Sequence, residues 1–298
     1  MADHVEALSV EALDVSVVYG FRSAAEADLV RILGHDRLSG ARLPSVTWHA
    51  QTAAPGPVDI RIEVDDVGDD LVVQYSGAIR TPRYRVDKPG FHWDFTKVLA
   101  AVVIPRLLAR NVLVLHAATV TRNGIGVLLP GSSGAGKSSV AFAARGLGAD
   151  VPASELSFLR DGVLVAGNSR MTVDAAAVDR FGLPAFDSAD QEGYRVLLPT
   201  SASDAPAAVT RLLFPRVCAG TLAVRPITAR RARMLLFENA VSQLPISQLV
   251  AHETFPLGAA PTRTELDLVA QQIEKLSQLS PVIVEGSPDE VARFALAQ

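Results

Sequence analysis

The stretch Gly131-Ser132-Ser133-Gly134-Ala135-Gly136-Lys137-Ser138-Ser139 decides the fold, because it fills every fixed position of the pattern G-x-x-x-x-G-K-[ST]. Glycines in this pattern let consecutive backbone N–H groups turn inward around a polyphosphate. The Lys137 ammonium then supplies charge to the outer phosphates, and the Ser138 hydroxyl is placed to ligate Mg²⁺. The sequence therefore predicts a phosphate-binding loop at residues 131–139.

The patterns on both sides of this loop agree with the prediction. Residues 124–129 read as a strand that enters the loop, and Ser139 to Arg145 read as a helix that leaves it and stops at Gly146. A loop at a helix N-terminus adds the partial positive end of the helix dipole to the cradle. The alternative is a serine- and glycine-rich surface turn, which has no reason to carry Gly-Lys-Ser between a strand and a helix.

The composition predicts a soluble globular protein. Of the 298 residues, 49% are hydrophobic and 20% charged, which suffices for a buried core. A net charge of −4 gives no general attraction to nucleic acid or to an anionic membrane. The single cysteine, Cys218, excludes an internal disulfide and suits a reducing cytosol. No secretion signal opens the sequence, and the apolar run 98–104 is far shorter than the ~20 residues that span a bilayer, so we expect a cytoplasmic location.

The first part of the chain has the pattern of a small β-rich domain. Residues 14–19, 58–64 and 71–75 read as strands, and two of the three alternate apolar and polar residues as half-buried strands do. A helix capped by Asp94 then runs to about Leu107. We therefore divide the chain into an N-terminal β-rich α+β domain at 1–94 and a larger domain at 95–298.

Two hairpin signals predict that the loop lies on a mixed or largely antiparallel sheet. Asn123-Gly124 separates the apolar run 112–120 from the strand that enters the loop, and Asp161-Gly162 separates two further apolar runs. Parallel-sheet enzymes with this loop connect neighbouring strands by helical crossovers instead. The sequence also lacks an N-K-x-D guanine reader and an apolar strand ending in adjacent acids, which disfavours a GTPase or a motor ATPase.

A resemblance to a known family is carried by His116-Ala117-Ala118, the Asn-Gly turn, residues 128–138 and Leu147-Gly148-Ala149-Asp150, and it covers about Leu99 to the C-terminus. These motifs resemble the catalytic domain of bacterial HPr kinase/phosphorylase. They are more similar still to the HPr-kinase-related kinases found beside biosynthetic and peptide-modification genes. The resemblance implies an α/β fold of HPr kinase and phosphoenolpyruvate carboxykinase type, with the P-loop kinase domain on a mixed sheet, and it implies ATP and Mg²⁺ as cofactors.

The resemblance also assigns roles to residues outside the loop. His116 matches the family's active-site histidine, and Ser154-Glu155 stands where the family has two aspartates that activate the acceptor hydroxyl and help to hold metal. Asp179 corresponds to the acidic residue that completes the metal site, so the implied ligands are Ser138, Glu155 and Asp179. Read without the family, His116 is a core histidine, Glu155 a carboxylate at a strand edge and Asp179 half of an exposed ion pair.

The C-terminal part offers structural support rather than chemistry. Helices are expected at 230–238, after Thr264, and after Ser287, which opens a capping box with Glu290. Three arginines flank the strands of this part and are expected at the surface, with one of them a candidate for contact with substrate phosphate. They are Arg211, Arg216 and Arg225.

Together these features predict a kinase that uses ATP and Mg²⁺ to transfer a phosphoryl group to a hydroxyl of a protein, a peptide or a metabolite. The catalytic candidates are His116, Lys137, Ser154 and Glu155. The alternative is a non-catalytic ATP-binding regulatory module, because Ser154 cannot serve as the usual base. A carboxykinase is disfavoured, since the sequence shows no arginine and metal-ligand set for a small dicarboxylate. No nucleic-acid or membrane partner is expected, and assembly into a homo-oligomer is left open.

Overall fold

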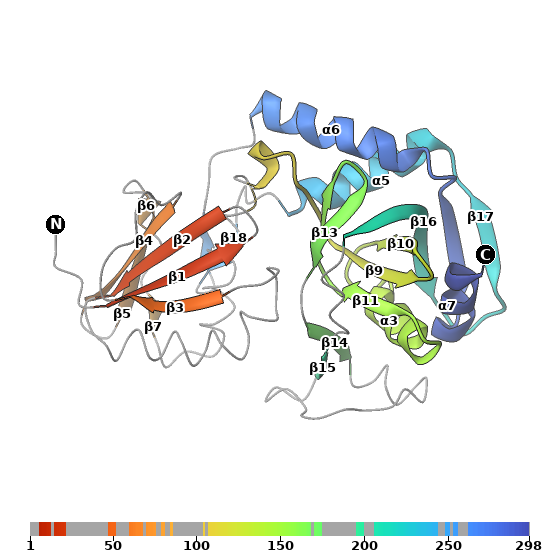
Figure 1. The fold of residues 1–298 in the computed structure, drawn as a ribbon, viewed down its shortest axis with the longest axis horizontal. Helices are drawn as coiled ribbons and strands as arrows, with labels where there is room; N and C mark the ends of the chain where they lie inside the picture. The colour runs from red at the N-terminus through yellow and green to blue at the C-terminus, as the bar shows by residue number, and fades with distance from the viewer. Residues whose placement is uncertain are drawn as a thin grey trace. The chain divides into compact units, whose positions relative to one another are not determined.

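The computed structural model describes backbone and side chains for residues 104, 107–167, 206–243 and 262–297, and strand backbone alone within 6–85, 170–199 and 248–255. The chain divides into two compact units, of which the first joins Met1–Leu107 to Leu244–Thr262 and the second joins Leu108–Gln243 to Arg263–Gln298 (Figure 1). The boundary predicted between residues 94 and 95 lies outside the described residues. Of the helix predicted from Asp94 to about Leu107, residues 104 and 107 are described, and both are helical.

The first unit contains a seven-stranded sheet in the order β3-β1-β2-β4-β5-β6, with β7 also paired to β5. Neighbouring strands of this sheet run antiparallel, except for β2 and β4, which run parallel to each other. β18 (Gln248–Val250) and β19 (Glu253–Phe255) form a separate antiparallel pair. The strands of the larger sheet are β1 (Glu6–Ala12), β2 (Val15–Phe21), β3 (Thr47–Gln51), β4 (Ile60–Val67), β5 (Asp70–Tyr75), β6 (Ile79–Arg80) and β7 (Tyr84–Arg85).

The second unit is built on a nine-stranded, largely antiparallel sheet, which confirms the predicted mixed α/β class. Seven strands follow the order β11-β9-β10-β16-β13-β12-β8, and β16 also pairs with β20, which pairs with β17. Two pairs are parallel, β10 with β16 and β16 with β20. The strands are β8 (Leu113–Leu115), β9 (Ala117–Arg122), β10 (Ile125–Pro130), β11 (Asp150–Ala153), β12 (Ser157–Arg160), β13 (Val163–Gly167), β16 (Ala207–Val217), β17 (Ala223–Pro226) and β20 (Val282–Gly286). β14 (Arg170–Asp174) and β15 (Arg195–Pro199) form a separate pair.

Both predicted hairpins are present. β9 and β10 pair across Asn123-Gly124, whose φ angles are 52° and 78°, and β12 and β13 pair across Asp161-Gly162, whose φ angles are 52° and 79°. Two successive left-handed residues form the tight turn that matches the twist of the flanking strands, and Asn, Asp and Gly adopt this conformation at the lowest cost. Local turn chemistry therefore sets the antiparallel character of this part of the sheet.

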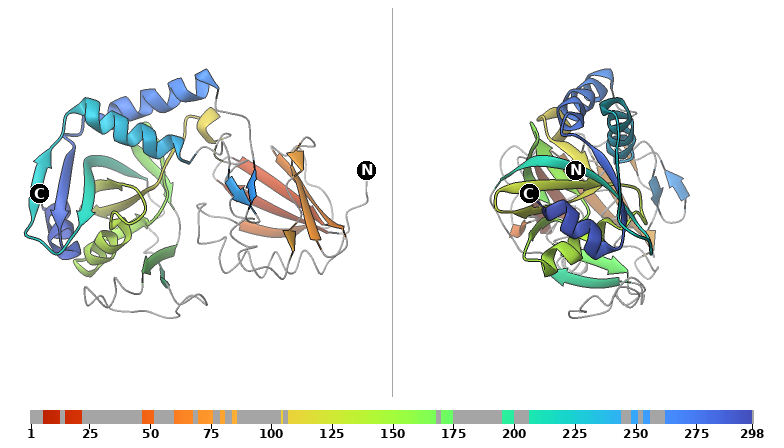
Figure 2. Two further views of the ribbon diagram at one scale, coloured as in Figure 1. Left: turned by 180° about the vertical axis from the view of Figure 1, so that it is seen from behind. Right: turned by 90° about the vertical axis from the view of Figure 1, so that its right-hand side faces the viewer.

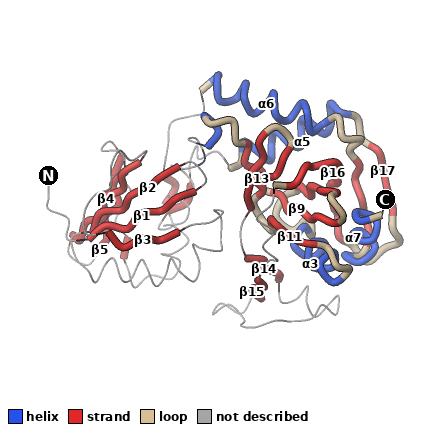
Figure 3. The backbone as a smooth tube through the Cα atoms, in the orientation of Figure 1, coloured by secondary structure: helices blue, strands red, loops and turns tan. Residues whose placement is uncertain are grey.

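Four helices of the second unit pack in pairs on the sheet. α3 (Lys137–Gly146) contacts α7 (Pro288–Leu296), and α5 (Ala229–Val241) contacts α6 (Arg263–Ser277). The two pairs lie on opposite sides of the sheet (Figures 2 and 3). The predicted capping box at Ser287 and Glu290 is confirmed at the start of α7. Among the helices that the structure describes, none has the length and apolar character needed to cross a bilayer.

The main apolar core lies between the α3–α7 pair and the sheet. α3 contributes small residues to it, and small side chains let the helix approach both the sheet and α7 closely. The sheet supplies branched residues from its central strands. The core includes Val120, Val127, Leu129, Val140, Ala141, Ala144, Leu213, Val284, Val291, Ala292 and Ala295.

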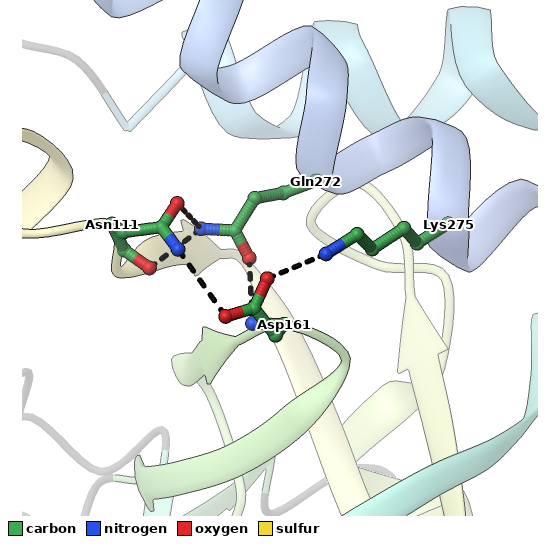
Figure 4. A network of polar contacts seen from close by, with 4 residues as sticks. All are labelled: Asn111, Asp161, Gln272 and Lys275. Carbon is green, nitrogen blue, oxygen red and sulfur yellow. Dashed lines mark hydrogen bonds and ion pairs between the residues drawn. The ribbon is translucent and has the colours of Figure 1, made fainter.

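A polar network fastens α6 to the sheet on the opposite side (Figure 4). Gln272 is 3% exposed, and its Nε2 donates to the Asn111 carbonyl at 2.6 Å and to Asn111 Oδ1 at 3.1 Å. Its Oε1 accepts from the backbone N–H of Asp161 at 3.1 Å. Lys275 of the same helix donates to the Asp161 carboxylate at 2.5 Å and holds the pKa of that carboxyl below its usual range. One buried amide thus joins the chain before β8, the β12–β13 turn and α6.

We expect Gln272→Ala to lower the free energy of unfolding by about 2–3 kcal/mol, because it leaves the Asn111 carbonyl and the Asp161 N–H without their partner. Gln271 is the matched control, since it is the preceding residue of α6 and is exposed. Gln271→Ala should change stability by less than about 0.5 kcal/mol. Urea unfolding of both variants makes the comparison, and equal effects of the two substitutions would contradict this role of the network.

Candidate functional site

The register of the sheet brings three candidate segments to one edge. β9 begins where β10 ends, because Ala117 pairs with Pro130, and Gly131 therefore follows directly beside His116. β11 also runs antiparallel to β9 and ends with Ala153 paired to Thr119. His116, the start of the 131–139 loop and Ser154-Glu155 consequently leave the sheet at the same edge, where open α/β sheets commonly bind ligands.

The 131–139 loop has the conformation of a phosphate cradle. Gly134 and Gly136 adopt φ angles of 81° and 90°, which glycine reaches without steric cost. A Cβ on Gly136 would also lie 2.2 Å from Cγ2 of Val217, at the end of β16. The Ala135 N–H donates to the Ser132 carbonyl at 3.2 Å, and Ser132, Ser133 and Gly134 are exposed. The loop is therefore folded tightly at its base and accessible at its tip.

Helix α3 begins at the end of this loop without a side-chain cap. Its first turn contains no acidic residue, and its N-cap is Gly136, which has no side chain to accept the first N–H groups. The unsatisfied donors and the partial positive charge of the helix dipole therefore point toward the loop. This arrangement favours an anion at the site, and a phosphate group has the geometry to accept several of these donors.

Lys137 places a buried cation on the inner side of the loop. The residue is 6% exposed, and its Nζ donates to the carbonyls of Gly131 at 2.9 Å and Ser132 at 3.0 Å. Burial lowers the pKa of the Lys137 ammonium from 10.5 to about 8, and the nearby negative charge of Glu155 partly opposes this shift. The charged lysine is thus held at a cost in desolvation, which an incoming anion would relieve.

Glu155 and Ser154 lie in the short connection between β11 and β12. Glu155 is half-buried, and its carboxylate is near enough to Lys137 to act on that residue's pKa. Ser154 is 1% exposed. The structure therefore brings Glu155 to the lysine side of the loop, whereas Ser154 is packed inside the protein.

His116 lies at a bend rather than within a strand. The apolar run 112–120 is continuous in the sequence, but in the structure it divides into β8 and β9, because β8 pairs with β12 while β9 pairs with β10 and β11. Ser157 supports the bend by donating from Oγ to the Ala117 carbonyl at 2.9 Å. His116 is half-buried at this position. It is therefore not one of the fully buried residues of the strand core.

The predicted metal ligands are placed in part. Ser138 follows Lys137 in the first turn of α3, and Glu155 lies near that lysine, but Asp179 falls outside the described residues. The described residues contain no group of three or more His, Cys, Asp and Glu side chains that would hold a metal ion by themselves. A hydroxyl and one carboxylate fit Mg²⁺ only in combination with phosphate oxygens and water, which is how Mg²⁺ commonly binds beside nucleotides.

The structure gives the three candidate arginines structural partners. Arg211 donates from Nη1 to the carbonyls of Ala295 at 2.7 Å and Ala297 at 2.6 Å, at the C-terminal end of α7. Arg216 and Arg225 both pair with Glu285 on β20. A cation at a helix C-terminus complements the dipole there. No phosphate-binding role is needed to explain these residues.

Sequence reasoning missed one residue that reaches the site. Asn239, in the last turns of α5, donates from Nδ2 to the carbonyl of His116 at 3.0 Å and to that of Gly131 at 3.5 Å. It belongs to no motif and lies more than a hundred positions from both partners in the chain. A single sequence carries no signal that would have identified it.

Comparison with known proteins adds no family to this geometry. No protein-family model matches the chain, and no curated protein matches it with significant similarity.

The depressed pKa of Lys137 makes the stability of the protein depend on pH. Below about pH 8, Lys137 is protonated in both the folded and the unfolded state, and the folded state bears the cost of desolvating the charge. Between about pH 8 and 10.5, the folded state has released this proton while the unfolded state still holds it. The free energy of unfolding therefore rises with pH over this range. Relative to Lys137→Met, the wild type should gain up to about 3 kcal/mol between pH 7 and 10.5. Urea unfolding of both proteins at several pH values measures this gain, and a difference that stays constant with pH would rule it out.

Proposed function

We propose that this chain binds ATP with Mg²⁺ at residues 131–139 and transfers the terminal phosphoryl group to a hydroxyl, as a kinase similar to the HPr kinase/phosphorylase group. The observation that supports this most directly is the uncapped N-terminus of α3, preceded by a glycine loop around a buried lysine. A surface turn would have no use for a buried cation. The position of the loop on a mixed sheet agrees with the same proposal.

The loop residues bind and neutralise the phosphates. Backbone N–H groups at the start of α3 donate to phosphate oxygens, and Lys137 adds a full positive charge. The Ser138 hydroxyl and the Glu155 carboxylate are the residues that would hold Mg²⁺, directly or through water. When bound, Mg²⁺ offsets the negative charge of the phosphates. In phosphoryl transfer the protein forms few covalent bonds itself. Positioning of the reactants and electrostatic stabilisation of the phosphates therefore account for most of the rate enhancement.

Glu155 is the carboxylate that we assign to the acceptor step. Ser154 is buried and has no basic group, so it does not replace the missing aspartate. Glutamate reaches one methylene further than aspartate, and Glu155 already lies near Lys137. It can therefore take the proton of the acceptor hydroxyl, with His116 at the same sheet edge as the alternative base.

The burial of Ser154 also favours a second candidate, a regulatory module that binds ATP without turnover. In that case the loop serves as a switch, and the change from aspartate to serine marks the loss of the reaction. The two candidates differ in one observable. A switch binds Mg·ATP and releases no ADP when acceptors are added, whereas a kinase releases ADP in step with phosphorylation of the acceptor.

We expect Glu155→Gln to reduce turnover by ~10² to 10⁴, because it removes the base, while the affinity for ATP measured without Mg²⁺ is kept, because the phosphate cradle at 131–139 is intact. Ser154→Ala should reduce turnover much less. ADP release with protein, peptide and metabolite hydroxyl acceptors gives the rates, and calorimetry gives the affinities. Full activity of Glu155→Gln with an identified acceptor would remove this mechanism, and ATP binding without ADP release in the wild type would favour the switch.

A further inference from the structure

Asn239 connects α5 to both sides of the proposed nucleotide site. Its Nδ2 donates to the carbonyl of His116 at 3.0 Å, at the bend before β9, and lies 3.5 Å from the carbonyl of Gly131, at the start of the loop. Leu236 and Ala240 of the same helix are buried, so α5 is packed against the rest of the unit. A fixed helix thus presents one amide donor to two backbone carbonyls that the sheet register has brought together.

The Gly131 carbonyl has two donors in the structure, and they differ in length. Lys137 Nζ donates to it at 2.9 Å and also to the Ser132 carbonyl at 3.0 Å, whereas Asn239 Nδ2 makes the longer contact of 3.5 Å. The shorter bond from the charged group dominates in this state. Asn239 is therefore a second donor, already in position beside the first.

Binding of a phosphate in the loop would draw Lys137 away from these carbonyls. The lysine of such loops reaches the outer phosphates, so its ammonium exchanges carbonyl partners for phosphate oxygens. The Gly131 carbonyl would then lose its shorter bond, and a backbone carbonyl left without a donor in a partly buried place weakens the bound state. A replacement donor at the same carbonyl removes that cost.

We propose that Asn239 is a positioning residue that keeps the Gly131 carbonyl paired when Lys137 turns to the phosphates, and so raises affinity for phosphate-bearing nucleotides. This inference rests on the proposed function, because it requires a phosphate in the loop. Asn239 does not touch the reacting atoms; it acts through the loop backbone and through Lys137.

The oxygen of the Asn239 side-chain amide supports a role of this residue in ligand binding rather than in folding. Asn239 Oδ1 is buried and finds no donor within the part of the chain that the structure describes. The two carbonyls require the nitrogen to face them, so the oxygen must take the opposite, unpaired place. An amide that leaves one buried atom unpaired adds little to stability, so we assign the role of this side chain to the contacts that its nitrogen makes at the loop.

The test compares two neutral variants that lack the donor, Asn239→Leu and Asn239→Ala, with Glu238→Leu as control, since Glu238 is the exposed preceding residue of α5. Calorimetry should show Mg·ATP affinity reduced about 5- to 10-fold in both Asn239 variants and unchanged in the control. Without nucleotide, urea unfolding should show the Asn239 variants nearly as stable as the wild type, because Lys137 still donates to the carbonyls of Gly131 and Ser132.

Each other outcome is decisive. If the wild type binds Mg·ATP and the Asn239 variants bind it equally well, the inference is wrong while the proposed function stands. If affinity falls together with a marked loss of stability to urea, the substitution has distorted the loop, and Asn239 has a structural role instead. If the wild type binds no Mg·ATP, the proposed function and the inference both fail.

Discussion

The pairing of β9 with β10 on one side and β11 on the other is the constraint on which the site depends. Both neighbours run antiparallel to β9, so both end where β9 begins, and the chain segments that follow them emerge together. β16 runs parallel to β10 and ends at the same edge, where Val217 fills the space beside Gly136. A shift of one residue in this register would separate Lys137 from Glu155 and reverse the facing of every side chain in the strand.

The second constraint is electrostatic. The fold holds an ammonium group in a buried place, with two backbone carbonyls as its hydrogen-bond acceptors. Burial disfavours the charge, and the uncapped start of α3 adds further positive potential to the same volume. Without a ligand, this positive potential is not neutralised, and the site therefore favours the binding of an anion. A loop that is already tightly folded can therefore still be stabilised further when an anion binds.

Much of the fold was predictable from local sequence, and much of the site was not. The Asn-Gly and Asp-Gly turns, the strand before the loop and the capping box of α7 each depend on a few adjacent residues, and each was predicted at the correct place. The break at His116 depends on which strands pair with each half of an apolar run, and a single sequence does not encode that choice locally. The contacts of Asn239 and Gln272 also join positions far apart in the chain. Asp179 remains a prediction, because it lies outside the described residues.

The most direct test of the central claim is amide hydrogen exchange of the full chain with and without Mg·ATP. If the loop cradles the phosphates, exchange should slow in peptides covering residues 131–140, because their N–H groups become donors to phosphate. Peptides from the C-terminal half of α6, which contacts the Asp161 turn at the other end of β12, should exchange at the same rate in both samples. Unchanged exchange at 131–140 under saturating nucleotide, or protection confined to other segments, would contradict the account.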